Sequence, residues 1–125
     1  MNKLGVHALV RVGGWSHEEA ARAIGQTAEL GYDLIEVPAL DPSSIDVDFT
    51  RRELEKAGIG VTLSLGPDGH ADISNGDEGK VVRGEAVLMD ALAVGHDLCR
   101  HAREFTLAQI KAAAEAQSHS AGLGT

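Results

Sequence analysis

Several features are scarce in this sequence, and each scarcity excludes a class of protein. Only 3% of the 125 residues are aromatic, one is a cysteine, and no apolar run is long enough to span a membrane. The lone Cys99 cannot form a disulfide within the chain, which favours a reducing compartment. No charged-then-apolar signal peptide opens the sequence, so we expect a cytoplasmic protein without membrane contact.

Basic residues are also in the minority. The chain has 11 Lys and Arg against 19 Asp and Glu, and its net charge is −8. This charge disfavours binding to nucleic acid or to an anionic membrane, although it says little about a neutral ligand such as a sugar. Apolar residues make up 43%, as in a folded domain with one moderate core.

Strand-like and helix-like segments alternate along the chain. Short apolar runs predict buried strands over 4–10, 33–37 and 60–65, with Pro38 and Pro42 bounding the loop after the second. Helices are predicted from Ser16, over 50–57 and over 78–98. This alternation predicts an α/β fold with a parallel sheet, either a (β/α) barrel or an open doubly wound sheet.

Helix boundaries have their own sequence signals. Ser16 with Glu19, and Thr50 with Glu53, have the spacing of capping boxes at helix starts. Gly31 and Gly58 stand where helices stop. The third helix is expected to carry an apolar stripe of four residues: Val82, Ala86, Met89 and Ala93.

The alternation stops near residue 98. A helix is plausible over 106–117, but nothing in the last residues has the pattern of a buried strand. We therefore divide the chain into βα units over 1–98 and a divergent helical tail over 99–125.

Three segments in order, 13–16, 31–38 and 61–66, resemble the first βα units of a known family. It contains the D-tagatose, D-psicose and L-ribulose 3-epimerases, which are xylose-isomerase-like TIM barrels. The resemblance extends to about Leu98, roughly four-fifths of the chain. It implies a partial (β/α) TIM barrel of about three parallel strands with outer helices and an extra C-terminal helix.

The resemblance also implies an activity, the epimerisation of a ketose at C3. In the family, two glutamates exchange a proton through an enediolate. A divalent metal (manganese, cobalt or magnesium) polarises the carbonyl and is held by the two glutamates, an aspartate and a histidine of later strands. All four would lie beyond Leu98, and no residue of the tail matches them. We expect a truncated chain with no catalytic or metal-binding residue, no bound metal and no activity alone.

The chain should retain the sugar-facing rim of such a site. Barrel sites lie at the carboxyl ends of the strands, which places five residues near the pocket: His7, Trp15, Glu36, Leu65 and Gly66. Position 7 is usually aromatic in the family. Each residue also has a structural interpretation: a satisfied core histidine for His7, a hydrophobic cap on the first helix for Trp15, a structural pair with an arginine or with backbone donors for Glu36, and strand-end geometry for Leu65 and Gly66.

Three other interpretations remain open. Gly13-Gly14 precedes a helix start, where free N–H groups favour an anion such as phosphate, although the fuller glycine pattern of a dinucleotide site is absent. His96, Cys99 and His101 are metal-ligand types, but they do not share one helix face, and only His70 could join them. Three strands leave an open sheet edge. The alternative function is therefore a non-catalytic half-barrel that forms homo-oligomers or docks on a full-length relative.

Overall fold

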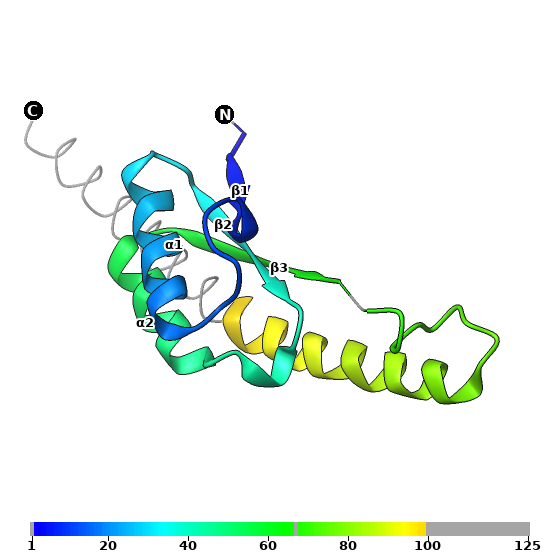
Figure 1. Cartoon of the computed structure of the whole chain (residues 1–125). Helices are drawn as coiled ribbons and strands as arrows, with labels where there is room; N and C mark the ends of the chain where they lie inside the picture. The colour runs from blue at the N-terminus through cyan, green and yellow to red at the C-terminus, as the bar shows by residue number, and fades with distance from the viewer. Residues whose placement is uncertain (1, 67, 100–125) are drawn as a thin grey trace, which may run out of the picture.

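A computed structural model describes residues 2–66 and 68–99 of the chain. Three parallel strands form one sheet in the order β1-β2-β3, and helices follow each strand (Figure 1). The elements are β1 (Gly5–His7), η1 (Ala8–Val10), α1 (His17–Glu29), β2 (Leu34–Ala39), η2 (Pro42–Ser44), α2 (Val47–Ala57), β3 (Gly60–Leu65) and a helix over 78–99. The predicted α/β fold with three parallel strands is confirmed. The helix predicted over 106–117 lies outside the described residues.

The first capping box is confirmed and the second is wrong. The Ser16 hydroxyl accepts the Glu19 N–H at 3.2 Å, and the Glu19 carboxylate accepts the Ser16 N–H at 3.0 Å. In contrast, α2 begins at Val47 because Asp46 caps it by accepting the Phe49 N–H at 2.9 Å. Thr50 therefore lies inside the helix.

Both predicted glycine stops are confirmed. Gly31, directly after the C-cap of α1, has a φ of 82°, and Gly58 ends α2 with a φ of 70°. These left-handed conformations strain any residue with a Cβ, so glycine is the residue that ends both helices at low cost.

Two strand boundaries differ from the prediction. The first strand ends at His7 instead of residue 10, because the imidazole Nδ1 accepts the Leu9 N–H at 3.1 Å and starts η1. Pro38 lies within β2 and not in the loop after it. Since β1 pairs with β2 only as far as Glu36, a residue without an N–H at position 38 removes no bond to β1.

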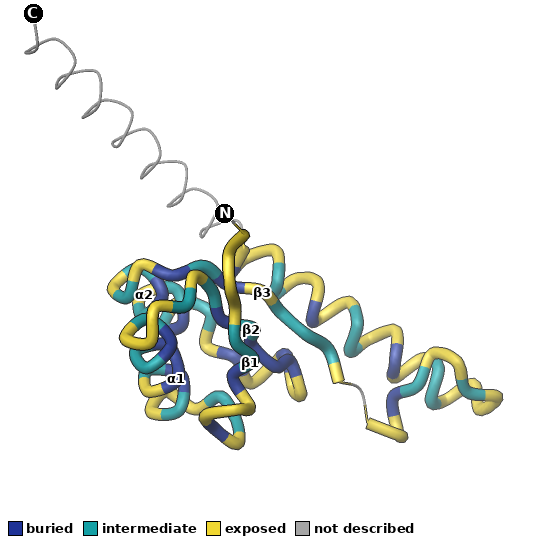
Figure 2. Tube along the Cα trace, turned by 90° about the horizontal axis from the view of Figure 1, so that it is seen from above, coloured by how far each residue is buried: buried dark blue, intermediate teal, exposed yellow. Residues whose placement is uncertain are grey.

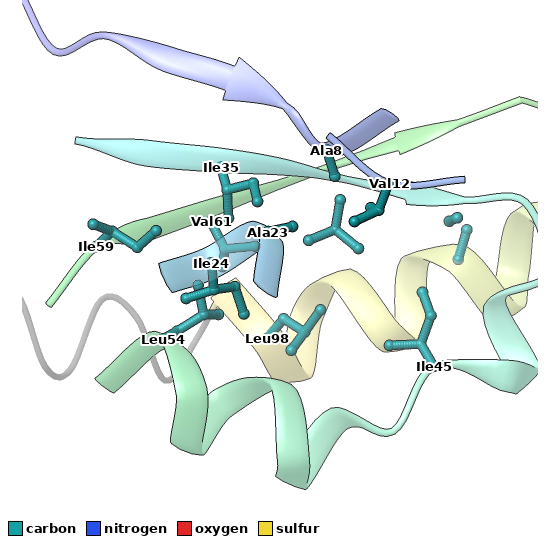
Figure 3. Close-up of a cluster of buried hydrophobic side chains, with 13 residues drawn as sticks. Ala8, Val12, Ala23, Ile24, Ile35, Ile45, Leu54, Ile59, Val61 and Leu98 are labelled. Carbon is teal, nitrogen blue, oxygen red and sulfur yellow. The ribbon is translucent and has the colours of Figure 1, made fainter. Parts of the chain in front are cut away.

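The hydrophobic core fills the space between the sheet and the helices, which lie on one side of it (Figure 3). Ile35 and Val37 of β2 point into this layer, where they pack in one cluster with Ala23 and Ile24 of α1. Because side chains alternate along a strand, Glu36 belongs to the opposite face, which no described helix covers. The sheet thus has one buried apolar face and one open polar face.

Asp77 precedes the helix over 78–99 and caps it, because its carboxylate accepts the N–H of Gly79 at 2.8 Å. It packs through Ala91 and Leu98, which are buried. The predicted stripe is wrong: Val82 and Met89 are 60% and 64% exposed. Alanine and valine occur all round this helix, so composition did not identify its packed side. Figure 2 shows buried and exposed positions alternating along it. Within residues 2–66 and 68–99, no helix is long and apolar enough to cross a membrane.

Candidate functional site

The open face of the sheet brings three polar side chains together, one from each strand. His7 ends β1 and is in register with Glu36 of β2, while Ser64 lies near the end of β3. The His7 Nε2 is 3.3 Å from the Glu36 Oε1 and 3.2 Å from the Ser64 Oγ. The imidazole therefore reaches across β2 and links all three strands near their carboxyl ends.

Hydrogen bonding fixes the orientation and the tautomer of this histidine. The Leu9 N–H donates to Nδ1, so Nδ1 is the acceptor and the ring hydrogen is on Nε2. Nε2 then donates toward Glu36, whose carboxylate accepts, with the Ser64 hydroxyl beside it. The Leu9 N–H, just after β1, thus orients the imidazole so that the Nε2–H of His7 points into the cluster.

The cluster is partly open to solvent. The side chains of His7 and Glu36 are 35% and 41% exposed. Together with the Ser64 hydroxyl they offer an N–H donor directed at Glu36, a carboxylate whose second oxygen has no hydrogen-bond partner among the described residues, and a hydroxyl that both donates and accepts. This set is suited to hydrogen-bonding the vicinal hydroxyl groups of a polar, uncharged ligand.

Trp15, Leu65 and Gly66 do not join this cluster. The Trp15 indole N–H donates to the buried Thr50 hydroxyl at 3.1 Å, which ties the loop before α1 to α2. The Leu65 side chain packs against the core and lines the space beside the helix over 78–99. Gly66 follows β3 at the rim and is exposed. These contacts favour the structural interpretation of Trp15 and Leu65.

Ser64 is the member of the polar cluster that the sequence analysis did not single out. The alternation in β3 carried a usable signal, since Thr62 and Ser64 occupy one face and Leu63 and Leu65 the other. The sequence does not show which residues of β2 lie beside Ser64. The register does: Ser64 is paired with Pro38 and so lies beyond Glu36 at the strand ends.

A second polar cluster joins the starts of α1 and α2. The His17 Nε2 lies 2.8 Å from the Asp46 Oδ2, and its ring stacks on Phe49 with centroids 4.0 Å apart. The hydrogen bonds from the Phe49 N–H and from His17 lower the pKa of Asp46. This cluster clamps the two helix starts together and was not apparent from the sequence.

The start of α1 is poorly suited to the phosphate considered for Gly13-Gly14. The Glu19 carboxylate lies next to Gly14, 3.1 Å from where a Cβ would be, and occupies the Ser16 N–H. Hydrogen bonds from the Ser16 backbone and hydroxyl lower the pKa of Glu19, which keeps it anionic. A phosphate would meet this negative charge.

The described residues do not assemble a cation site. Across 2–66 and 68–99, no three His, Cys, Asp or Glu side chains converge as metal ligands would. His96 contacts Asp97 at 3.3 Å, while the Cys99 thiol points to the Val61 carbonyl at 3.9 Å. Burial raises the pKa of that thiol, which disfavours the thiolate that a metal needs. His101 lies outside the described residues.

Known proteins resemble this chain in sequence and in fold. No family model matches the chain. The L-ribulose 3-epimerase of Mesorhizobium japonicum is 34% identical over 98 residues, which are 78% of this chain and 33% of that protein. The ketose 3-epimerase of Arthrobacter globiformis is 36% identical over 74% of this chain and 32% of its own length.

Solved structures agree. The D-allulose 3-epimerase of Methylomonas sp. in complex with D-allulose is 38% identical and superposes with a TM-score of 0.74, over 77% of this chain and 33% of that one. D-psicose 3-epimerase in the presence of D-fructose is 25% identical, with a TM-score of 0.68 over 78% and 34%. The chain spans about a third of the length of these relatives. It is therefore a homologue of the ketose 3-epimerases, with the fold of part of their (β/α) barrel.

Proposed function

We propose that the open polar face is the sugar-binding part of a ketose 3-epimerase site. The observation that carries this proposal is the contact of His7 with Glu36 and Ser64 at the carboxyl ends of three adjacent parallel strands. Sites of (β/α) barrels lie at that end of the strands. The relatives are L-ribulose and ketose 3-epimerases, and one structure holds D-allulose, a ketose.

The three side chains would divide the binding between them. The free oxygen of Glu36 accepts a sugar hydroxyl, the His7 Nε2–H is shared between Glu36 and the ligand, and Ser64 adds a second contact. Gly66 would place its backbone at the rim. Trp15 and Leu65, the other predicted site residues, would shape the pocket indirectly by holding the first loop and the end of β3.

Epimerisation itself is not assigned to this chain. Exchange of the C3 proton needs an acid and a base on opposite faces of the sugar, and the family supplies a divalent metal. The described residues do not fit a metal, because no three ligand side chains converge. We propose that the chain binds the sugar without turning it over, in the cytoplasm, where one unpaired cysteine is expected to stay reduced.

A second candidate function is that of a non-catalytic half-barrel that associates with another polypeptide. The observation in its favour is the edge of β3, which among the described residues pairs with β2 alone. An unpaired edge is a ready template for another strand.

A chimera tests the sugar-binding proposal. Residues 2–98 replace the segment that they align with in the Methylomonas D-allulose 3-epimerase, and conversion of D-allulose to D-fructose is followed. We expect turnover. In the chimera, Glu36→Gln should lower kcat/KM by about 10- to 100-fold, mainly through KM, because a hydrogen bond to a charged group is lost. Glu29→Gln, the same change at the far end of α1, should leave it unchanged.

Either of two results would contradict the proposal. One is a folded chimera, judged by circular dichroism, that binds no D-allulose in calorimetry. The other is an active chimera in which Glu36→Gln and Glu29→Gln behave alike.

A further inference from the structure

The turn after β1 depends on one nitrogen of His7. The Leu9 N–H donates to the His7 Nδ1 at 3.1 Å, and this bond caps the start of η1. A neutral imidazole has one N–H and one acceptor nitrogen, whereas a protonated imidazole has two N–H groups and no acceptor. Protonation would therefore set two donors against each other, and no rotation of the ring would restore the acceptor. The turn is compatible only with the uncharged histidine.

The contacts of the other ring nitrogen have the opposite dependence on charge. The His7 Nε2 lies 3.3 Å from the Glu36 Oε1 and 3.2 Å from the Ser64 Oγ. A hydrogen is present on Nε2 in the uncharged tautomer described above and in the protonated ring. The added positive charge strengthens its bond to the carboxylate. A proton gained by this ring therefore strengthens the link from β1 to β2 and removes the bond to Leu9.

His7 is the group that controls this turn near neutral pH. Among the described residues, the titratable side chain in contact with its ring is Glu36 of β2. The contact from β3 is the Ser64 hydroxyl, and η1 consists of alanine, leucine and valine, so neither element adds a charge. The helices lie on the other side of the sheet. Histidine typically changes its charge between about pH 5 and about pH 8, and carboxylates do so at lower pH.

Only a short piece of chain is able to respond to this change. Ala8 and Val12 both belong to the buried core (Figure 3) and hold the two ends of the piece. Between them, Leu9 and Val10 are 43% and 71% exposed. Residues 9–11 directly follow the carboxyl end of β1, where the polar cluster lies. A change in the turn is therefore confined to the edge of that cluster.

We propose that His7 makes the turn after β1 a pH-sensitive switch beside the polar cluster. At mildly alkaline pH, the uncharged ring binds the Leu9 N–H and keeps the turn closed. In mild acid, the protonated ring keeps its bond to Glu36 and releases Leu9, so η1 loses its cap and residues 9–11 change position. This inference adds regulation to the proposed sugar site, and it rests on that proposed function only for its effect on the sugar.

NMR of the whole 125-residue chain tests the switch. A scalar coupling through the N–H···N bond, between the Leu9 amide nitrogen and the His7 Nδ1, reports the bond directly. We expect this coupling at about pH 8, with the ring hydrogen on Nε2, and its loss by about pH 5 as the ring gains a proton. After correction for the intrinsic rate, the Leu9 amide should then exchange about tenfold faster, because one hydrogen bond is lost.

Two substitutions serve as matched controls. His7→Asn replaces the ring by an acceptor that does not titrate and that suits this turn, since the Asp41 Oδ1 accepts the N–H two residues on, at Ser43, at 3.1 Å. The Leu9 amide of this variant should show no transition between about pH 8 and about pH 5. His17→Asn removes another histidine that contacts a carboxylate, and it should leave the Leu9 transition as in wild type.

Four results would each overturn the inference. They are a ring hydrogen on Nδ1 at about pH 8, a ring still uncharged at about pH 5, a bond to Leu9 that survives protonation, and the same transition in His7→Asn. None of these measurements uses a sugar. Failure of the switch therefore leaves the sugar-binding proposal to the chimera, and a chimera that binds no D-allulose leaves the switch as a property of the turn.

Discussion

Asp46 shows how one side chain connects two helices. Its Oδ1 caps α2 by accepting the Phe49 N–H, and its Oδ2 accepts from His17 at the start of α1. The cap and the histidine both favour the charged carboxylate, so they lower its pKa in the folded chain. A residue that sequence analysis passed over therefore contributes to joining the two helix starts.

The first prediction concerns the pH dependence of stability at this residue. Because the folded pKa of Asp46 is below the unfolded value of about 3.9, its contribution is complete above about pH 5 and disappears as the pH falls through the folded pKa. Asp46→Asn keeps a capping side chain but does not titrate. We expect urea unfolding to show a smaller loss of stability for Asp46→Asn than for wild type between pH 5 and pH 3. Parallel pH profiles would contradict this assignment.

Individual site residues were only partly predictable. Glu36 and His7 interrupt apolar strands, which is a visible signal because an unpaired buried carboxylate is costly. The alternation in β3 puts Ser64 on the same face as Thr62, but its place beside His7 depends on the register of β3 with β2, which the sequence does not show. The contact of Trp15 with Thr50 joins segments far apart in sequence, and spacing carries no information about such a pair.

Two helices carry glycines with opposite surroundings. Gly25 lies within α1, and a Cβ built there meets nothing within 4 Å. Gly84 lies in the helix over 78–99, where a Cβ would be 2.9 Å from the Ile73 side chain and 3.0 Å from its backbone nitrogen. The loop before that helix therefore packs onto it through the gap that Gly84 leaves.

Alanine at these two positions should have opposite effects. Gly25→Ala is expected to raise the free energy of unfolding by about 1 kcal/mol, because alanine favours the helix and fits the space. Gly84→Ala gains the same propensity but forces the backbone at Ile73 to move, and we expect a net loss of about 1 kcal/mol or more. Urea unfolding of both variants measures the difference. A gain in Gly84→Ala would show that the loop does not pack as described.

Elements were predicted better than their ends. The strands, helices and glycine stops follow from local periodicity and from backbone conformations that only glycine adopts cheaply. Asp46 and Thr50 could each have been the N-cap of α2, and the spacing of residues does not decide between them. The buried side of the helix over 78–99 depended on where β3 lies, so a nearly uniform apolar pattern gave the wrong stripe.

At the scale of the whole molecule, helices bury one face of the sheet, and within residues 2–66 and 68–99 no helix covers the face that carries His7 and Glu36. The fold was predicted from the order of three segments that resemble a known family. The homologues have the same fold over about a third of their length. Local sequence patterns do not identify what contacts the polar face or the edge of β3, because periodicity describes only the strands and helices that form those surfaces.

The last prediction belongs to this scale. The purified 125-residue chain, incubated with D-fructose, D-allulose or L-ribulose and manganese, should show no epimerisation, because no described residues converge as a metal site. Chromatography of the sugars after prolonged incubation measures it, with the Methylomonas enzyme as the positive control. Turnover that requires manganese would place catalytic groups in this chain and contradict the proposed division of roles.

The bond from the Leu9 N–H to His7 has a consequence for how this protein can change over evolution. The same imidazole ends the first strand with one nitrogen and supplies the hydrogen of the polar cluster with the other. If His7 binds the sugar as proposed, a substitution at position 7 changes the end of the first strand and the hydrogen bonding of the ligand together. An aromatic residue without a ring nitrogen there would lose the bond to the Leu9 N–H and the contact with Glu36, so the turn after β1 would have to be capped in another way.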